Sequence, residues 1–165
     1  SHWNPHPPYP GMTHTALPLF SRDLMIVTEE CTKEDCSDWP KLTWVVDMRD
    51  ETNLIPISTL PLPPMEDFKP RGGRYGSHNV HENKPGDLSF LSDNIIFGTF
   101  FSGGLRAYDL TNPLMPKEVG AFVPEAPKGS RVGSIQFNDV HVDEKGIVYT
   151  MDRMAGGLYI LEMEF

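Results

Sequence analysis

The sequence predicts an all-β chain: a β-propeller segment of about three four-stranded blades, the third of them incomplete. Three observations predict this fold. One pattern of short strands recurs at intervals of about 60 residues. The 165 residues include 14 glycines and 16 prolines, a turn-rich composition. No stretch free of Gly and Pro has the apolar spacing of an amphipathic helix. Because a propeller closes with about four or more blades, we expect other chains to complete the ring.

The strands of the three copies are short runs rich in Val, Ile, Thr and aromatic residues, bounded by turn residues. The second copy is the clearest, the first is the most diverged, and the third lacks its fourth strand. Strands are expected near 14–19, 23–28, 42–48 and 53–60 in the first copy, near 78–81, 94–101, 104–110 and 117–123 in the second, and near 137–143, 146–151 and 157–163 in the third.

The domain organisation predicted from these copies is an extended Pro-rich arm at 1–12 followed by a partial propeller at 13–165, with blades at about 13–60, 77–123 and 136–165. Four prolines exclude a helix or a central strand from the arm. Its two large aromatic residues, Trp3 and Tyr9, favour docking on a surface, and a disordered tail is the alternative.

Two recurring features predict the turns. The Gly-Gly pairs at 103–104 and 156–157 precede a strand in each copy, which suits tight turns with positive φ. Acidic residues recur where the third strand of each copy ends, and we expect them to accept backbone hydrogen bonds in the following turn. These residues are Asp47, Asp109 and Glu162.

Charge and hydropathy exclude two classes of function. The net charge of −9, without a basic stripe, argues against nucleic-acid binding. No apolar run reaches the roughly 18 residues of a membrane span, and no signal peptide is expected at the start. We therefore expect a soluble protein in the cytoplasm, or in the periplasm or outside the cell after processing of a precursor.

The only two cysteines, Cys31 and Cys36, lie in a polar stretch. Two exposed free thiols, a local disulfide and a metal pair are the alternatives. A disulfide would imply an oxidising compartment, and a metal pair lacks the further cysteines of a structural zinc site.

Histidines recur at equivalent positions of the copies. His14, His78 and Asn138 align at one position, and His81 and His141 align three residues further on. The first strand of each blade lines the channel of a propeller, so equivalent side chains form a ring there. Imidazole suits Cu, Zn and Fe.

We therefore predict a transition metal, Cu, Zn or Fe, bound by His14, His78 and His141, with His81 and Asp139 as catalytic residues. Asp139 and Glu82 are candidates to orient the ligands. The alternative is a structural role, in which each buried His bonds the backbone of a neighbouring blade. Because His78 and His81 are three residues apart, a regular strand would point them to opposite faces.

Residues 78–163 resemble the LVIVD-repeat family of β-propellers, and 13–60 do so loosely. The segments that carry the resemblance are Asn138 to Val140, Gly103 to Asp109 and Asn112 to Gly120. A more distant similarity is to selenium-binding protein (methanethiol oxidase) propellers, which use channel histidines in copper-dependent oxidation. The resemblance implies the propeller fold and assigns no residue a role.

The function predicted is a subunit or processed fragment of a propeller metalloenzyme acting on a small molecule. Oxidoreductase chemistry is favoured and metal-assisted hydrolysis comes second. The alternative is a non-catalytic propeller scaffold that binds a protein through the long loops 61–77 and 124–135. In either case we expect a partner polypeptide to supply the missing fourth strand after Glu162.

Overall fold

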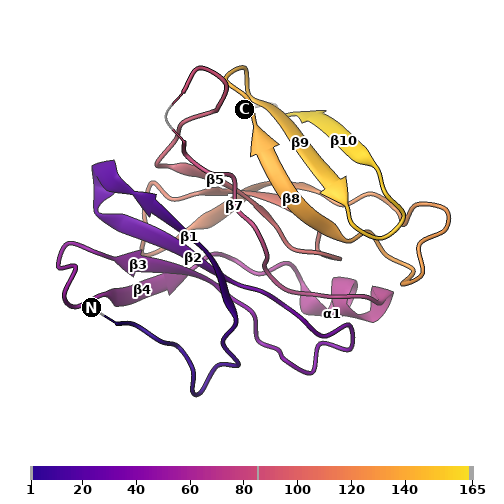
Figure 1. Ribbon diagram of the computed structural model, residues 1–165, viewed down its shortest axis with the longest axis horizontal. Helices are drawn as coiled ribbons and strands as arrows, with labels where there is room; N and C mark the ends of the chain where they lie inside the picture. Colours follow the sequence, from indigo (N-terminus) through magenta and orange to yellow (C-terminus); the bar gives the residue numbers. More distant parts are fainter. Residues whose placement is uncertain (1, 85, 164–165) are drawn as a thin grey trace.

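Three antiparallel sheets make up the computed structural model, which describes residues 2–84 and 86–163 (Figure 1). Within each sheet, strands that follow one another in the chain are neighbours, and the three sheets do not form a closed ring. The all-β prediction is confirmed. The strands are β1 (Thr13–Leu19), β2 (Leu24–Glu29), β3 (Thr43–Asp47) and β4 (Ile55–Thr59) in the first sheet, β5 (Ile95–Thr99), β6 (Leu105–Asp109) and β7 (Lys117–Phe122) in the second, and β8 (Phe137–Val142), β9 (Ile147–Asp152) and β10 (Leu158–Glu162) in the third.

The segment expected as the first strand of the second copy is shortened. It forms a single antiparallel bridge, between Val80 and Gly98 of β5. Two flanking backbone bonds extend the contact: His78 N–H donates to the carbonyl of Thr99 (3.1 Å), and His81 N–H to that of Phe97 (2.9 Å). The third sheet has three strands, as expected, and no fourth in the chain described as far as residue 163.

Helices are confined to single turns, which agrees with the lack of amphipathic spacing. α1 (Met65–Phe68) lies in the loop between the first two sheets and is followed by a 3₁₀ turn (Lys69–Arg71). A second 3₁₀ turn (Phe20–Arg22) joins β1 to β2. No helix in residues 2–84 and 86–163 has the length and apolarity needed to cross a membrane.

The sheets pack face to face in chain order. Successive side chains of a strand point to opposite faces, so the middle sheet contacts a neighbour on each side. In the middle sheet, Ile96 of β5 faces the first sheet while Phe97 faces the third. The two interfaces form separate apolar cores. The core between the first and second sheets comprises Leu17, Leu19, Leu24, Ile26, Val45, Leu60, Val80, Ile96, Tyr108 and Leu110. The core between the second and third comprises Phe97, Leu105, Ala107, Ile135, Phe137, Val140, Val142 and Val148.

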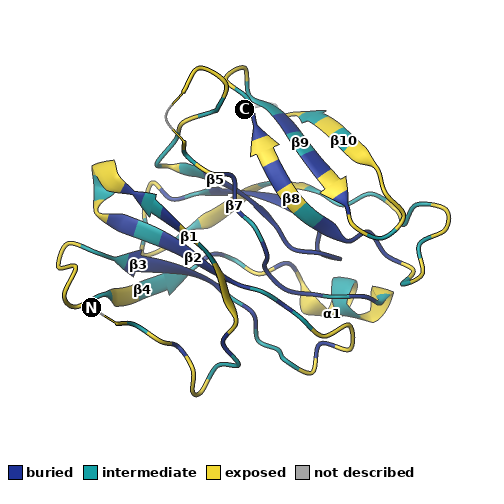
Figure 2. Ribbon diagram, viewed as in Figure 1, coloured by how far each residue is buried: buried dark blue, intermediate teal, exposed yellow. Residues whose placement is uncertain are grey.

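The two outer faces of this stack differ. On the first sheet, Trp3 and Tyr9 of the N-terminal segment pack edge-on against Trp44, at ring-centroid distances of 5.6 and 5.0 Å. On the third sheet, Leu158 and Ile160 are exposed, and Figure 2 shows exposed stretches along β10. Leu158 lies directly opposite Met151, which is also exposed. The third sheet therefore leaves the apolar side chains of Met151, Leu158 and Ile160 uncovered within the described chain.

The turn predictions hold at most positions. Gly104, Gly156 and Gly157 have positive φ of 82°, 76° and 145°. Asp47 Oδ1 accepts the backbone N–H of Arg49 (3.0 Å). Likewise, Asp109 Oδ1 accepts the N–H of Thr111 (2.7 Å).

The two long loops pack against one another. The hydroxyl of Ser134 donates to the carbonyl of Gly72 (2.7 Å), which ties loop 124–135 to loop 61–77. Tyr75 is fully buried, and its hydroxyl donates to the carbonyl of Pro63 (2.5 Å). Side chains of both loops thus make hydrogen bonds within the chain.

Both cysteines are free and buried, so the prediction of free thiols is right and the prediction of their exposure is wrong. They belong to a small core with Tyr75, Phe100 and Phe101. Burial raises the pKa of Cys31 to about 12, and the nearby Asp38 carboxylate adds to this effect.

Phe137 is the residue whose truncation tests the stacked-sheet packing. It is fully buried and contacts Phe122 of the second sheet and Tyr159 of the third, at centroid distances of 6.1 and 5.1 Å. Phe137→Ala should lower the free energy of unfolding by about 3–5 kcal/mol, measured by urea titration. Phe20→Ala, at a position 78% exposed, should change it by less than about 0.5 kcal/mol. Equal effects would contradict the described core.

Candidate metal centre

His14 and Asn138, which align in the repeats, occupy irregular positions of their strands. The pairing of β1 with β2 shifts register between Thr13 and Thr15, so His14 is the extra residue of a bulge. The pairing of β8 with β9 shifts in the same way between Phe137 and Asp139, at Asn138. A bulge re-aims its side chain and leaves its backbone outside the regular ladder. His78, the third aligned residue, lies just before the bridge to β5.

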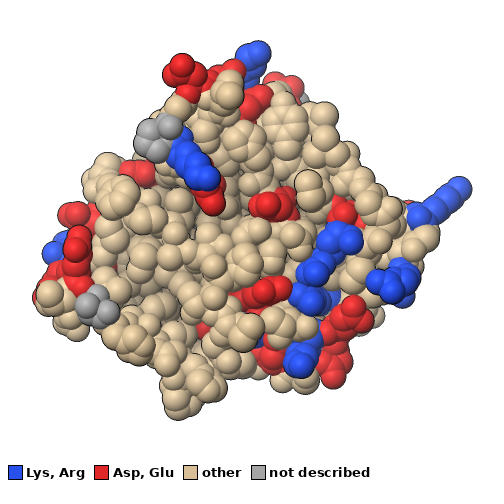
Figure 3. All heavy atoms as spheres, viewed as in Figure 1, with Lys and Arg blue, Asp and Glu red and all other residues tan. Residues whose placement is uncertain are grey.

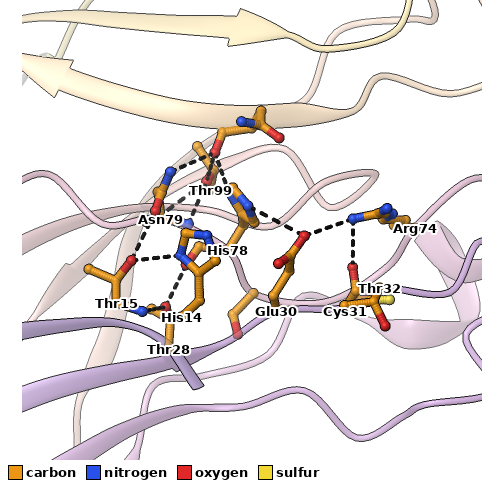
Figure 4. Close-up of polar contacts among 12 residues, drawn as sticks. His14, Thr15, Thr28, Glu30, Cys31, Thr32, Arg74, His78, Asn79 and Thr99 are labelled. Atoms are coloured by element: carbon orange, nitrogen blue, oxygen red, sulfur yellow. Dashed lines mark hydrogen bonds and ion pairs between the residues drawn. The ribbon is translucent and has the colours of Figure 1, made fainter. Parts of the chain in front are cut away.

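The aligned residues meet in space (Figure 4). The imidazole rings of His14 and His78 lie 4.2 Å apart between centroids. Glu30, which follows β2 directly, joins them. One ligand atom from each of the three side chains lies within 4.8 Å of the others, and His78 Nε2 lies 3.7 Å from Glu30 Oε1. His14 is exposed, Glu30 is partly exposed and His78 is buried, so the group opens to solvent on the His14 side.

The proton on His78 is fixed by the third sheet. Its Nδ1 lies 2.5 Å from the backbone carbonyl of Asn138, and a carbonyl can only accept. Nδ1 therefore carries the proton, and Nε2 directs its lone pair toward Glu30. Burial lowers the pKa of His78, and the neighbouring His14 and Arg153 act in the same direction. The neutral ring that results is the form that binds a metal ion.

A short hydrogen-bond chain fixes the proton on His14 in the same way (Figure 4). The hydroxyl of Thr15 donates to Asn79 Oδ1 (2.9 Å), so its oxygen accepts the proton of His14 Nδ1 (2.8 Å). The amide of Asn79 is itself oriented, because its Nδ2 donates to the carbonyl of Asn138 (3.3 Å). Nε2 of His14 is therefore also left with a free lone pair.

Glu30 is held by an arginine. Arg74 Nη1 donates to Glu30 Oε1 (2.8 Å) and to the carbonyl of Cys31 (3.2 Å). The second carboxylate oxygen of Glu30 is not engaged by Arg74. Glu30 is thus the anionic member of the group, and Arg74 keeps its carboxylate in place.

The donor set fits a transition metal. Two neutral imidazole nitrogens and one carboxylate suit Zn²⁺ or Fe²⁺ and leave further coordination positions open. Ligand atoms that share such an ion at about 2.0–2.2 Å lie about 3–3.6 Å apart. The spacing of 3.7–4.8 Å therefore needs a side-chain adjustment of about 1 Å.

His81 and His141 form a second pair, with ring centroids 5.3 Å apart. His81 has no free ring nitrogen: Nδ1 accepts the backbone N–H of Val142 (3.0 Å), and Nε2 donates to the carbonyl of Phe90 (2.9 Å). This is the arrangement that the structural alternative predicts. His141 Nε2 donates to the carbonyl of Leu88 (3.2 Å).

Asp139 lies with this second pair rather than with the metal group. It lines a hollow of about 550 Å³ together with His81 and His141. Thr15 and Asn79 reach the same hollow, whereas His14, Glu30 and His78 are not part of its lining.

The predicted site residues thus fall into two groups, and Glu30 rather than His141 lies beside His14 and His78. The reason is the offset of three residues, which places His141 at the level of His81. Orientation of the ligands comes from the Asn138 carbonyl and Thr15. It does not come from Glu82, which pairs with Lys84 (2.5 Å), or from Asp139. Sequence reasoning missed Glu30 because no equivalent acid recurs, although Glu30 lies two residues beyond the strand predicted at 23–28.

Comparisons with known proteins add no further constraint. A scan against protein-family models, a search of curated proteins and a search of solved structures each found no match to this chain.

The buried His81 gives a pH dependence. Burial lowers its pKa in the folded chain, and the nearby His141 contributes. Below about pH 6.5 the unfolded chain binds a proton that folded His81 does not, so the free energy of unfolding falls on acidification. The contribution is at most about 1.4 kcal/mol per pH unit and is lost in His81→Gln. NMR titration of the His81 ring should give a lower midpoint in the folded, metal-free protein than in urea; an equal or higher midpoint would contradict this.

Proposed function

We propose that this chain is a segment of a β-propeller metalloenzyme that binds one transition metal ion through His14, Glu30 and His78 and acts on a small molecule. The observation that carries the proposal is the convergence of two imidazoles and a carboxylate within 4.8 Å. Each imidazole has its Nδ1 proton committed to a neighbour, so each offers Nε2 as a ligand.

The chemistry follows from the small number of protein ligands. A metal ion held by two histidines and a carboxylate keeps positions open for water or substrate, where it acts as a Lewis acid or redox centre. Oxidation of a small molecule is our first choice of reaction, and metal-assisted hydrolysis is the second. Of the three ligands, His14 is exposed to solvent and His78 is buried, while Arg74 holds the carboxylate of Glu30 in place.

The propeller assignment draws support from the sheet arrangement. Three sheets stack face to face in chain order, and the aligned residues His14, His78 and Asn138 of the three copies lie in contact with one another. The resemblance to LVIVD-repeat propellers, and more distantly to methanethiol oxidase propellers, points to the same architecture and to metal-dependent oxidation.

A partner polypeptide forms part of this proposal. β10 pairs with β9 on one side, and its other side has no strand in the part of the chain that the structure describes. The exposed Met151, Leu158 and Ile160 provide an apolar face on the same sheet. A further blade with an apolar sheet face would cover these side chains, and a strand from it would pair with β10.

Metal titration tests the proposed centre. The chelator-treated chain should bind one equivalent of Zn²⁺ or Fe²⁺ by isothermal titration calorimetry, with Fe²⁺ handled without oxygen. His14→Ala and His78→Ala should each weaken binding by more than the roughly 10–100-fold typical of an outer-shell change, because each removes a ligand.

His141→Ala is the matched control, since His141 lies outside the group and should leave the affinity unchanged. A loss of affinity in His141→Ala, equal to that in His78→Ala, would restore His141 to the ligand set. Failure of every metal to bind stoichiometrically would overturn the proposed function.

Thr15 tests the fixed orientation of His14. Thr15→Val keeps the shape of the side chain but removes the hydroxyl that accepts from His14 Nδ1 and donates to Asn79. Metal affinity should fall about 10–100-fold. Thr13→Val makes the same change in the same strand, outside this hydrogen-bond chain, and should have no effect. If both variants bind metal equally well, the hydroxyl does not orient His14.

A further inference from the structure

Two arginines share one aromatic ring beside the metal group. The guanidinium carbons of Arg74 and Arg153 lie 5.5 and 5.7 Å from the ring centroid of Phe101. The ring of His78 lies 5.0 Å from the same centroid. A metal ligand and two cations from different parts of the chain are thus assembled around one side chain.

The Gly-Gly turn before β6 holds Phe101 in this position. Phe101 is fully buried and adopts a left-handed backbone conformation, with φ of 41°. Its carbonyl accepts the N–H groups of Gly104 (3.0 Å) and Phe137 (3.2 Å), so the residue links the turn to the third sheet. Backbone held in such a region is typical of functional sites. Here this backbone conformation positions the Phe101 ring that both guanidinium groups contact.

The positive charge of these arginines is only partly neutralised. Arg74 pairs with Glu30, but its Nε is buried and has no hydrogen-bond partner. Arg153 makes no side-chain hydrogen bond or ion pair with the described residues. The carboxylate of the adjacent Asp152 accepts the backbone N–H groups of Met154 (3.1 Å) and Ala155 (2.8 Å) instead.

This imbalance contrasts with the whole chain, whose net charge is −9. Basic side chains gather on the viewed face between the third sheet and α1, with acidic side chains next to them (Figure 3). A guanidinium presents a planar fork of donors that matches carboxylate, phosphate and sulfonate oxygens. The two arginines therefore offer donors at the edge of the metal group.

We propose that Arg74 and Arg153 form an oxyanion subsite beside the metal group, which binds the anionic end of the substrate. This proposal rests on the proposed function and names its substrate class: a small molecule bearing a carboxylate, phosphate or sulfonate. Arg153 supplies the exposed fork and Arg74 the inner one. The anion lies next to His78, so the rest of the molecule reaches the open coordination positions.

Anion titrations of the metal-free chain, followed by amide NMR, test the subsite. The probes are acetate, inorganic phosphate and methanesulfonate in a low-chloride buffer, with acetamide as the uncharged comparison. At least one anion should shift the resonances of Phe101, Ser102 and Arg153, and acetamide should not. Arg153→Gln should weaken this binding about tenfold or more, as expected for loss of a charged hydrogen bond.

Arg49→Gln is the matched control. It removes the same charge from an exposed arginine that pairs with Asp47, and it should leave anion binding unchanged. Equal weakening in both variants, unchanged binding in Arg153→Gln, or no shift with any anion would overturn the subsite.

Separate Zn²⁺ titrations distinguish the two proposals. Anion binding without metal binding would leave the subsite standing and contradict the metal function. Metal binding without anion binding would do the reverse. The relative affinities of the three anions identify which group the substrate carries.

Discussion

The backbone carbonyl of Asn138 is the point on which the arrangement of the three sheets and the site depends. It accepts hydrogen bonds from the side chains of His78, Asn79 and Thr99, at 2.5, 3.3 and 3.2 Å. Asn79 in turn accepts a hydrogen bond from Thr15 of the first sheet, so its side-chain amide connects that sheet to the carbonyl. That oxygen is available because Asn138 is the extra residue of a bulge and lies outside the regular ladder.

The same interaction connects folding to chemistry. By accepting from Nδ1 of His78, and indirectly by orienting the groups that accept from His14, the carbonyl sets the tautomer of both rings. The orientation of both imidazoles in the candidate metal site then follows from how the sheets pack, without a dedicated loop. Arg74 has the corresponding role on the other side of the group, because it holds the carboxylate of Glu30.

Much of the fold could be predicted, because strand repeats are a local property of the sequence. For example, the adjacent apolar residues Ile96 and Phe97 lie in a strand that is buried on both faces, and each contacts a different neighbouring sheet. The proximity of His14 and His78 also followed from the repeat alignment, whereas His141, predicted as a third ligand, lies beside His81 instead. Glu30 and Arg74 could not be found in this way, since neither lies at a repeated position. The burial of Cys31 was missed because its polar neighbours in sequence differ from its neighbours in space.

The unlike outer faces give the stack of sheets a direction. Trp3 and Tyr9 occupy the face of the first sheet around Trp44, while the face around Ile160 on the third sheet is bare. Head-to-tail growth into a filament requires each copy to offer both a bare donor face and a bare acceptor face. In this chain Trp3 and Tyr9 of the N-terminal segment occupy part of the first face, so a copy docking there would meet that segment. The two ends of the stack therefore present different surfaces: the N-terminal segment packed around Trp44 at the first sheet, and bare apolar side chains at the third.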